Sequence, residues 1–291
     1  MTPRIRLGDI TIHRLVEMEP RSGNRHAQEF LPGLTPELLA ENRHWMRPAS
    51  LDENDRIILC MQSYLVQTPH HLVLVDSCLG NDKNRPAHPR YHMKSDTRWM
   101  DALAGAGFAV EDIDIVLCTH LHVDHVGWNT RLADGRWVPT FPNARYLFSA
   151  RELAFWSERH AETPIPWIED SVLPVVAAQR VDLVQSDHAL DDHVRLIPTP
   201  GHTVDHFAVE LGPKAADAVI TGDLIHTPIQ ARYPELRMRI DHDPAQAATT
   251  RRAFLERFCD TPTLCCFAHF PSPSAGHVRR WGDGFRCDFV G

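Results

Sequence analysis

Residues 119–127 constrain this chain more than any other stretch, because they place four metal-capable side chains within six positions. His120, His122 and Asp124 alternate, so an extended backbone would turn all three to one side, while His125 would point elsewhere. Imidazole and carboxylate groups together suit zinc or a similar divalent first-row metal. One short loop could therefore offer ligands to two neighbouring ions. A chain with 19 His contains chance pairs, but chance rarely produces this ordered quartet.

The residues before this loop predict where it lies in the fold. Residues 113–118 are apolar and β-branched, which indicates a buried strand. The ligand loop would then lie at the carboxyl end of a strand, where α/β proteins usually place their chemistry. A polar residue follows a strand-like run at four further places, namely Asp76, His202, Asp223 and His269.

These five landmarks together resemble the metallo-β-lactamase fold superfamily, whose signature is His-x-His-x-Asp-His. They occur in the family's order between residues 76 and 269. The resemblance implies an α/β (α+β) fold of the four-layer αββα sandwich type. It also implies one hydrolase domain over residues 1–291. Composition and periodicity alone predict only an α/β chain with one domain.

The resemblance assigns seven residues to two divalent metal ions, with zinc as the expected metal and manganese, iron or cobalt as alternatives. His120, His122 and His202 would hold one ion, Asp124, His125 and His269 the other, and Asp223 would bridge both. Two cations roughly 3.5–4 Å apart repel, so an anionic bridge is physically required. His277 lies eight residues after His269 and competes for its place; His269 is preferred because it directly follows a strand.

Two further polar residues are expected to support the ligands rather than to bind metal. In the family the position of Asp76 holds the histidine-rich loop by hydrogen bonds, which is how outer groups fix ligand orientation. His206 is predicted to be such a supporting group or a core residue. Trp156, Trp167 and Ile168 are candidates for a substrate-pocket wall, although aromatic residues at this spacing more often belong to the core.

Several local signals predict helices and their first residues. Thr35 followed by Pro36 favours a short helix, as does Asp243 followed by Pro244. Ser149 is expected to cap a helix over residues 150–159, with Glu152 at the reciprocal position of a capping box. Residues 97–104 and 172–177 are also predicted to be helical. The polar residues 18–56 form an N-terminal excursion that could be a lid, a dimer contact or a packed surface segment.

Composition narrows the function classes. The formal net charge of −8 argues against a broad nucleic-acid surface, which needs a basic face. An apolar content of 43% is sufficient for a sizeable core. No segment is apolar for long enough to cross a bilayer, and no secretory leader is recognisable. The seven scattered cysteines suggest no disulfide framework, so a cytoplasmic location is expected.

The function implied by the resemblance is dinuclear metal-dependent hydrolysis. A metal-bridging hydroxide would attack the carbonyl of a carboxylic ester or lactone, and Asp124 could relay a proton to the leaving group. The expected partner is therefore a small-molecule ester or lactone, and a homodimer is possible. Asp223 stands where class B β-lactamases carry Cys or Ser, which argues against β-lactam hydrolysis.

Two segments resemble the lactonase and methyl-parathion-hydrolase-like branch in particular, residues 222–226 and residues 269–278. Acyl-homoserine-lactone lactonases place a Tyr three residues after the bridging Asp, whereas this chain has His226, which is expected to assist the carbonyl oxygen instead. The alternatives are a phosphotriester hydrolase or a thioesterase on the same site. An iron-dependent thiol dioxygenase ranks below both.

Overall fold

A computed structural model describes residues 4–213 and 216–290. The chain divides into two compact units, one of Met1–Met18 and Met61–Gln185, the other of Glu19–Cys60 and Ser186–Gly291. Each unit is built on one main β-sheet with its own apolar core. The prediction of a single domain remains a prediction.

The first unit contains a seven-stranded sheet in the order β1-β2-β5-β6-β7-β10-β11. Strands β6, β7, β10 and β11 are parallel neighbours, and the pairs from β1 to β6 are antiparallel. The strands are β1 (Arg4–Leu7), β2 (Ile10–Met18), β5 (Met61–Gln67), β6 (Leu72–Val75), β7 (Ile115–Leu117), β10 (Arg145–Ser149) and β11 (Val181–Val184). A small hairpin of β8 (Thr130–Ala133) and β9 (Arg136–Pro139) completes its β-structure.

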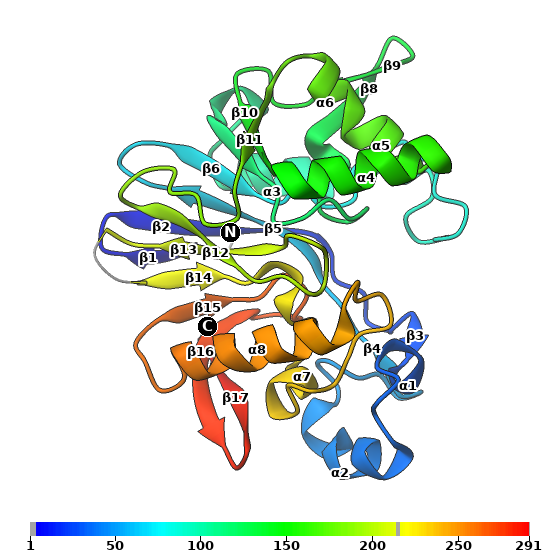
Figure 1. Ribbon diagram of the computed structural model, residues 1–291, viewed down its shortest axis with the longest axis vertical. Coiled ribbons are helices and arrows are strands. Elements are labelled where there is room, and N and C mark those ends of the chain that lie inside the picture. The colour runs from blue at the N-terminus through cyan, green and yellow to red at the C-terminus, as the bar shows by residue number, and fades with distance from the viewer. Residues whose placement is uncertain (1–3, 214–215, 291) are drawn as a thin grey trace. The chain divides into compact units, whose positions relative to one another are not determined.

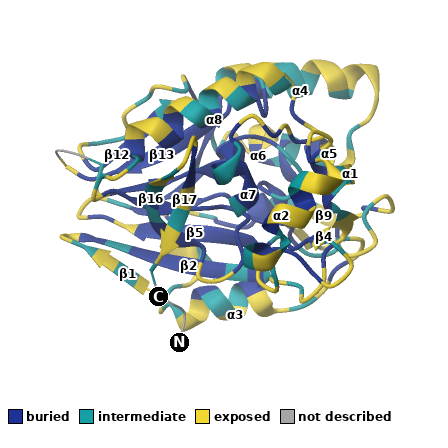
Figure 2. Ribbon diagram, turned by 90° about the horizontal axis from the view of Figure 1, so that it is seen from below, coloured by how far each residue is buried: buried dark blue, intermediate teal, exposed yellow. Residues whose placement is uncertain are grey.

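Helices of the first unit lie against its sheet (Figure 1), and their apolar side chains belong to its buried cluster. They are α3 (Arg98–Gly105), α4 (Ala150–Glu162), α5 (Pro166–Ser171) and α6 (Leu173–Ala177), with short 3-10 turns η1 (Val110–Asp112) and η2 (Gly127–Asn129). Trp99 of α3 and Val175 of α6 are completely buried in the same cluster as Leu74 and Val116. Strands β2 and β5 are also mostly buried, as their dark blue colour in Figure 2 shows.

The second unit contains a six-stranded sheet in the order β12-β13-β14-β15-β16-β17. Only β14 and β15 are parallel neighbours. The strands are β12 (Val194–Pro198), β13 (Phe207–Leu211), β14 (Ala218–Ile220), β15 (Leu264–Cys266), β16 (Ala275–Trp281) and β17 (Gly284–Phe289). Helix α8 (Pro244–Phe258) packs Phe254, Leu255 and Phe258 against this sheet.

The excursion predicted at 18–56 folds as part of the second unit from Glu19 onward, while Met18 still belongs to β2. It forms α1 (Ala27–Phe30), α2 (Pro36–Met46) and the two-stranded pair of β3 (Arg25–His26) and β4 (Arg56–Ile57). Its apolar residues, among them Leu39 and Met46, share a buried cluster with Ile229 of α7 (Pro228–Arg232) and with Leu236. It is therefore a packed segment of that unit, and a role as lid or dimer contact remains a prediction.

Strand direction brings chemistry to one edge of each sheet. In the first unit, parallel strands β6 and β7 end just before Asp76 and the 119–127 loop. In the second unit, β12, β14 and β15 all run in the same direction, and His202, Asp223 and His269 follow their carboxyl ends. The sequence prediction that polar residues follow strand ends is confirmed within each unit.

Among the described residues, no helix combines the length and apolar character that crossing a membrane requires.

Candidate metal centre

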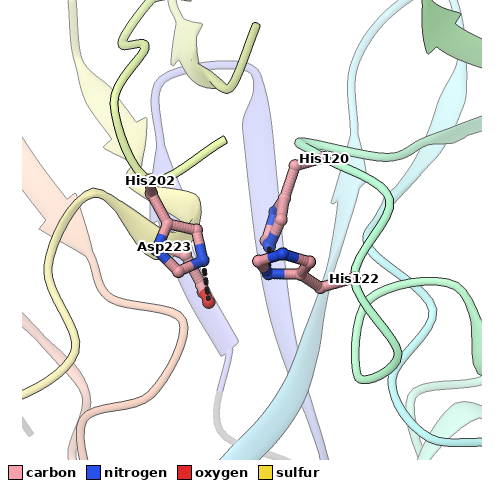
Figure 3. A group of neighbouring side chains, drawn as sticks. All are labelled: His120, His122, His202 and Asp223. Atoms are coloured by element: carbon pink, nitrogen blue, oxygen red, sulfur yellow. Dashed lines mark hydrogen bonds and ion pairs between the residues drawn. The ribbon is translucent and has the colours of Figure 1, made fainter. Parts of the chain in front are cut away.

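The first unit carries one group of candidate ligands, in the loop after β7. The His120 and His122 side chains face one another, with 3.0 Å between His120 Nε2 and His122 Nδ1 (Figure 3). The His120 and His125 rings lie 4.1 Å apart between centroids. Asp124 is partly exposed, whereas His125 is buried, and Asp124 Oδ1 lies 3.9 Å from His125 Nε2. The predicted quartet therefore gathers within one loop of the first unit.

Asp76 holds this loop, and its predicted supporting role is confirmed. Its Oδ1 accepts a hydrogen bond from the Thr119 backbone N–H at 2.8 Å, and its Oδ2 lies 2.8 Å from His125 Nδ1. A carboxylate can only accept, so the proton of the neutral His125 ring is on Nδ1 and the lone pair is on Nε2. Asp76 itself has a positive φ of 58°, which aspartate tolerates better than most residues.

The second unit carries another group of candidate ligands, a carboxylate surrounded by imidazoles. Asp223 lies in the 3-10 turn η3 (Gly222–Leu224) directly after β14. His202 Nε2 lies 3.3 Å from its Oδ2, as Figure 3 shows, and His226 Nε2 lies 3.1 Å from the same oxygen. His269 Nε2 lies 2.9 Å from Oδ1. All four side chains are almost completely buried.

The outer nitrogens of two of these rings determine where their protons are. His269 Nδ1 lies 2.9 Å from the Cys60 carbonyl oxygen, and His202 Nδ1 lies 2.9 Å from Asp241 Oδ1. Both partners only accept, so each neutral ring carries its proton on Nδ1 and points the lone pair of Nε2 at Asp223. Lone pairs at such distances repel unless a cation lies among them, either a proton or a metal ion. The donor set of the second unit therefore fits a divalent metal.

The pKa values of two of these histidines depend on burial and on the neighbouring carboxylates. Burial alone would lower the pKa of His202, but the hydrogen bonds and charges of Asp223 and Asp241 outweigh it and raise the pKa to about 9. Burial is the main reason why the pKa of His226 falls to about 4, so that ring is neutral at pH 7. Its Nε2–H then donates to Asp223, and its buried Nδ1 has no hydrogen-bond partner among the described residues.

His206 supports the turn that carries Asp223, as predicted. The Asp223 backbone N–H donates to His206 Nε2 at 2.8 Å, so the neutral ring is protonated on Nδ1 and donates to Thr199 Oγ1 at 2.7 Å.

His277, the residue that competed with His269 in the sequence, lies on β16, with its Nδ1 3.1 Å from the Thr263 carbonyl oxygen. Within the second unit, the structure thus places His269 rather than His277 beside His202 and Asp223.

Two of the three candidate pocket-wall residues contact the ligand loop. The Trp156 ring lies 5.5 Å from the His122 ring, and Trp167 Nε1 donates to the Leu121 carbonyl oxygen at 2.9 Å. Ile168 is completely buried in the core of the first unit.

The sequence did not predict that Asp241 and Arg251 contact the candidate ligands or their turn, and for Glu152 it predicted only a capping role. Asp241 lies 39 residues after His202, and nothing in its local sequence indicates the contact.

Comparison with known proteins defines the class. The sequence matches the family model of the metallo-beta-lactamase superfamily over residues 62–269, and the chain belongs to this superfamily. The predicted family and fold are thereby confirmed. The superfamily uses divalent metal ions, typically two, and His and Asp clusters that could hold metal are present among the described residues.

Among individual proteins, the chain is similar to hydrolase AbOPH of the beta lactamase superfamily, with a TM-score of 0.82 and 24% identity; the match covers 100% of this chain and 97% of that one. It is also similar to AidC, a dizinc quorum-quenching lactonase, with a TM-score of 0.76 and 22% identity, covering 100% and 98%. An N-acyl homoserine lactonase from Bacillus sp is 24% identical over 192 residues, 62% of this chain and 69% of the relative.

Proposed function

We propose that this protein is a dinuclear metal hydrolase of carboxylic esters, with lactones as the main substrate class. The observation that carries the proposal is the set of imidazole Nε2 atoms directed at Asp223 in the second unit. Following the superfamily's pattern, His120, His122 and His202 would hold one ion, Asp124, His125 and His269 would hold the other, and Asp223 would bind both. The order of these residues along the chain and the family match over 62–269 support this assignment.

Divalent ions bound to such a ligand set make a water molecule acidic enough to act as a nucleophile near neutral pH, and they polarise a carbonyl oxygen. The protein's own residues hold the ligands in place. Asp76 and Asp241 fix the rings of His125 and His202 so that Nε2 of each is presented to metal. Asp124 is partly exposed, which suits a carboxylate that passes a proton to the leaving group.

His226 is the residue that we assign to the substrate's carbonyl oxygen. Its ring is buried and neutral, and its one N–H, on Nε2, donates to Asp223 and would be released to a substrate oxygen when Asp223 binds metal. A neutral imidazole donor in a dry site stabilises negative charge that develops on an oxygen. The ring is fixed by a stacking contact with His269, whose centroid lies 5.6 Å away, so little reorganisation is needed.

The substrate class is proposed from the relatives and from the absence of a Cys or Ser at the bridging position. Two of the three similar proteins named above are lactonases. Because His226 replaces the lactonase Tyr, hydrolysis of phosphotriesters on the same ligand set is the second candidate.

A substrate panel tests the proposal. Protein of measured metal content is assayed with five- and six-membered lactones, aryl esters, phosphotriesters and thioesters, and oxygen uptake with a thiol is recorded in parallel. We expect the highest kcat/KM for lactones or aryl esters. A preference for phosphotriesters or thioesters would replace the substrate class, and oxygen uptake with iron-loaded protein, without any hydrolysis, would overturn the proposal. The same panel on His202→Ala protein is the matched blank.

A further inference from the structure

A completely buried arginine lies behind the ligands of the second unit. Arg251 projects from α8 and has no solvent exposure. Burial lowers the pKa of its guanidinium to about 10, which still leaves it charged at neutral pH. A buried charge of this kind is costly unless several acceptors surround it.

Three backbone carbonyl groups satisfy most of this guanidinium. Its Nε donates to the Leu224 oxygen at 2.8 Å, and Nη1 donates to the oxygens of Pro234 at 2.7 Å and Leu236 at 2.8 Å. Leu224 directly follows Asp223. One side chain therefore ties the turn of the proposed bridging ligand to the segment after α7.

The same guanidinium faces the carboxylate that orients His202. Arg251 Nη2 lies 3.9 Å from Asp241 Oδ2, which also accepts the Met238 backbone N–H at 2.8 Å. The other oxygen, Oδ1, lies 2.9 Å from His202 Nδ1. Both side chains of this Asp–Arg pair are completely inaccessible to solvent.

The backbone at Gly201 and His202 packs closely against the start of helix α8. The N–H groups of His242 and Asp243 donate to the oxygens of His202 and Gly201 at 3.0 and 2.9 Å. Gly201 has a φ of 127°, and a Cβ there would lie 2.2 Å from the Ala247 nitrogen of α8. Only glycine allows this close approach.

We propose that Asp241 and Arg251 are positioning residues that hold His202 and the Asp223 turn in the geometry that metal binding requires. Asp241 keeps the Nδ1 proton on His202 and presents Nε2, while Arg251 fixes Asp241 and Leu224 together. The inference rests on the proposed function, because it needs His202 and Asp223 to be ligands. Loss of such an outer partner typically weakens metal binding 10- to 100-fold.

The test measures metal affinity rather than activity alone. Zinc is titrated into metal-free protein in competition with a chromophoric chelator, and the visible spectrum of the cobalt-loaded protein is recorded. Asp241→Asn is expected to weaken the affected site about 10- to 100-fold and to alter the cobalt spectrum. Asp243→Asn is the matched control, since asparagine also caps a helix and Asp243 is exposed; it should bind like the unmodified protein.

Arg251→Lys provides a second variant on another element. Lysine keeps the charge but lacks the donor to the Leu224 oxygen, so the same loss of zinc affinity is expected. Arg252→Lys is its control, because Arg252 is the next residue on α8, is 40% exposed and pairs with Glu235. A purely structural role would lower the melting temperature of the Arg251 variant without changing zinc affinity of the folded protein, and would contradict the proposal.

The outcomes also separate the two proposals. Unmodified protein that binds none of zinc, cobalt, manganese and iron would overturn the proposed function itself. Unmodified protein that binds two equivalents, together with Asp241→Asn protein of equal affinity, would overturn only the positioning role. For variants that do not fold, the test is made on unmodified zinc-loaded protein by NMR. A His202 Nδ1 proton protected from solvent exchange supports the role of Asp241, and a rapidly exchanging proton contradicts it.

Discussion

Unlike the histidines proposed to bind metal, His226 is assigned to the substrate's carbonyl oxygen. It contacts Asp223 through one nitrogen, its other nitrogen has no partner among the described residues, and it packs edge-on against Phe30 at 6.0 Å between ring centroids. A neutral, buried ring acts as a hydrogen-bond donor rather than as a charge. The low pKa has the sign expected when burial dominates over the neighbouring carboxylate.

His226→Ala should therefore lower kcat while leaving metal content unchanged. Loss of one donor to a developing oxyanion typically costs about 100-fold or more in kcat. The measurements are steady-state kinetics and metal analysis on the same preparation. His277→Ala is the control, since His277 lies on β16 and bonds to the Thr263 carbonyl oxygen. Full activity of the His226 variant would remove this residue from the mechanism.

At the scale of elements, two helices hold the backbone of the His-x-His segment. Leu121 lies between His120 and His122, and its N–H faces Glu152 Oε2 of α4 at 3.4 Å. Its carbonyl oxygen accepts from Trp167 of α5 at 2.9 Å. Glu152 is completely buried and also accepts from Trp156 Nε1 at 3.0 Å. Helices α4 and α5 thus fix the loop at its midpoint, beyond the support that Asp76 gives at its ends.

Trp167→Phe tests this support because it removes one hydrogen bond and keeps an aromatic ring. A single hydrogen bond contributes about 1 kcal/mol, so zinc affinity should fall about fivefold. Trp45→Phe is the matched control, as Trp45 of α2 also makes one indole hydrogen bond, to Asn42 Oδ1. Equal affinities in the two variants would show that the loop is held without α5.

At the scale of the whole molecule, local signals predicted elements well. Strand β6 lies directly before Asp76, where a strand-like run is predicted, and Thr35, Ser149 and Asp243 each accept a backbone hydrogen bond at the start of the predicted helices. The helix expected at 172–177 begins instead at Leu173, with Pro174 in its first turn, and a separate helix precedes it. Cap and strand signals succeed because they depend on neighbours in sequence.

The supporting groups could not be predicted in this way. Arg251 and Leu224 lie 27 residues apart, and a single arginine on a polar helix is ordinarily a solvated residue. Its burial follows from packing between α8, the Asp223 turn and the segment after α7. The division into two units likewise depends on long-range contacts and has no composition boundary in the sequence.

A buried lysine predicts how stability changes with pH. Lys83 lies 2.6 Å from Thr130 Oγ1 and over the Trp137 ring, and burial lowers its pKa to about 7. Between pH 7 and 10.5 the unfolded chain therefore binds more protons at this site than the folded chain, so the site's contribution to stability rises with pH. The free energy of unfolding of unmodified protein relative to Lys83→Met should increase by about 2 kcal/mol from pH 7 to 9. Denaturant unfolding at both pH values measures it, and a constant difference would contradict the assignment.

The central claim is that seven side chains from distant parts of the sequence act through two bound cations. The most direct measurement is ester or lactone hydrolysis by chelator-treated protein as zinc, manganese or cobalt is added back in measured equivalents. We predict no hydrolysis without metal and full activity at about two equivalents per chain. Hydrolysis at the full rate in protein that contains no metal would contradict the claim.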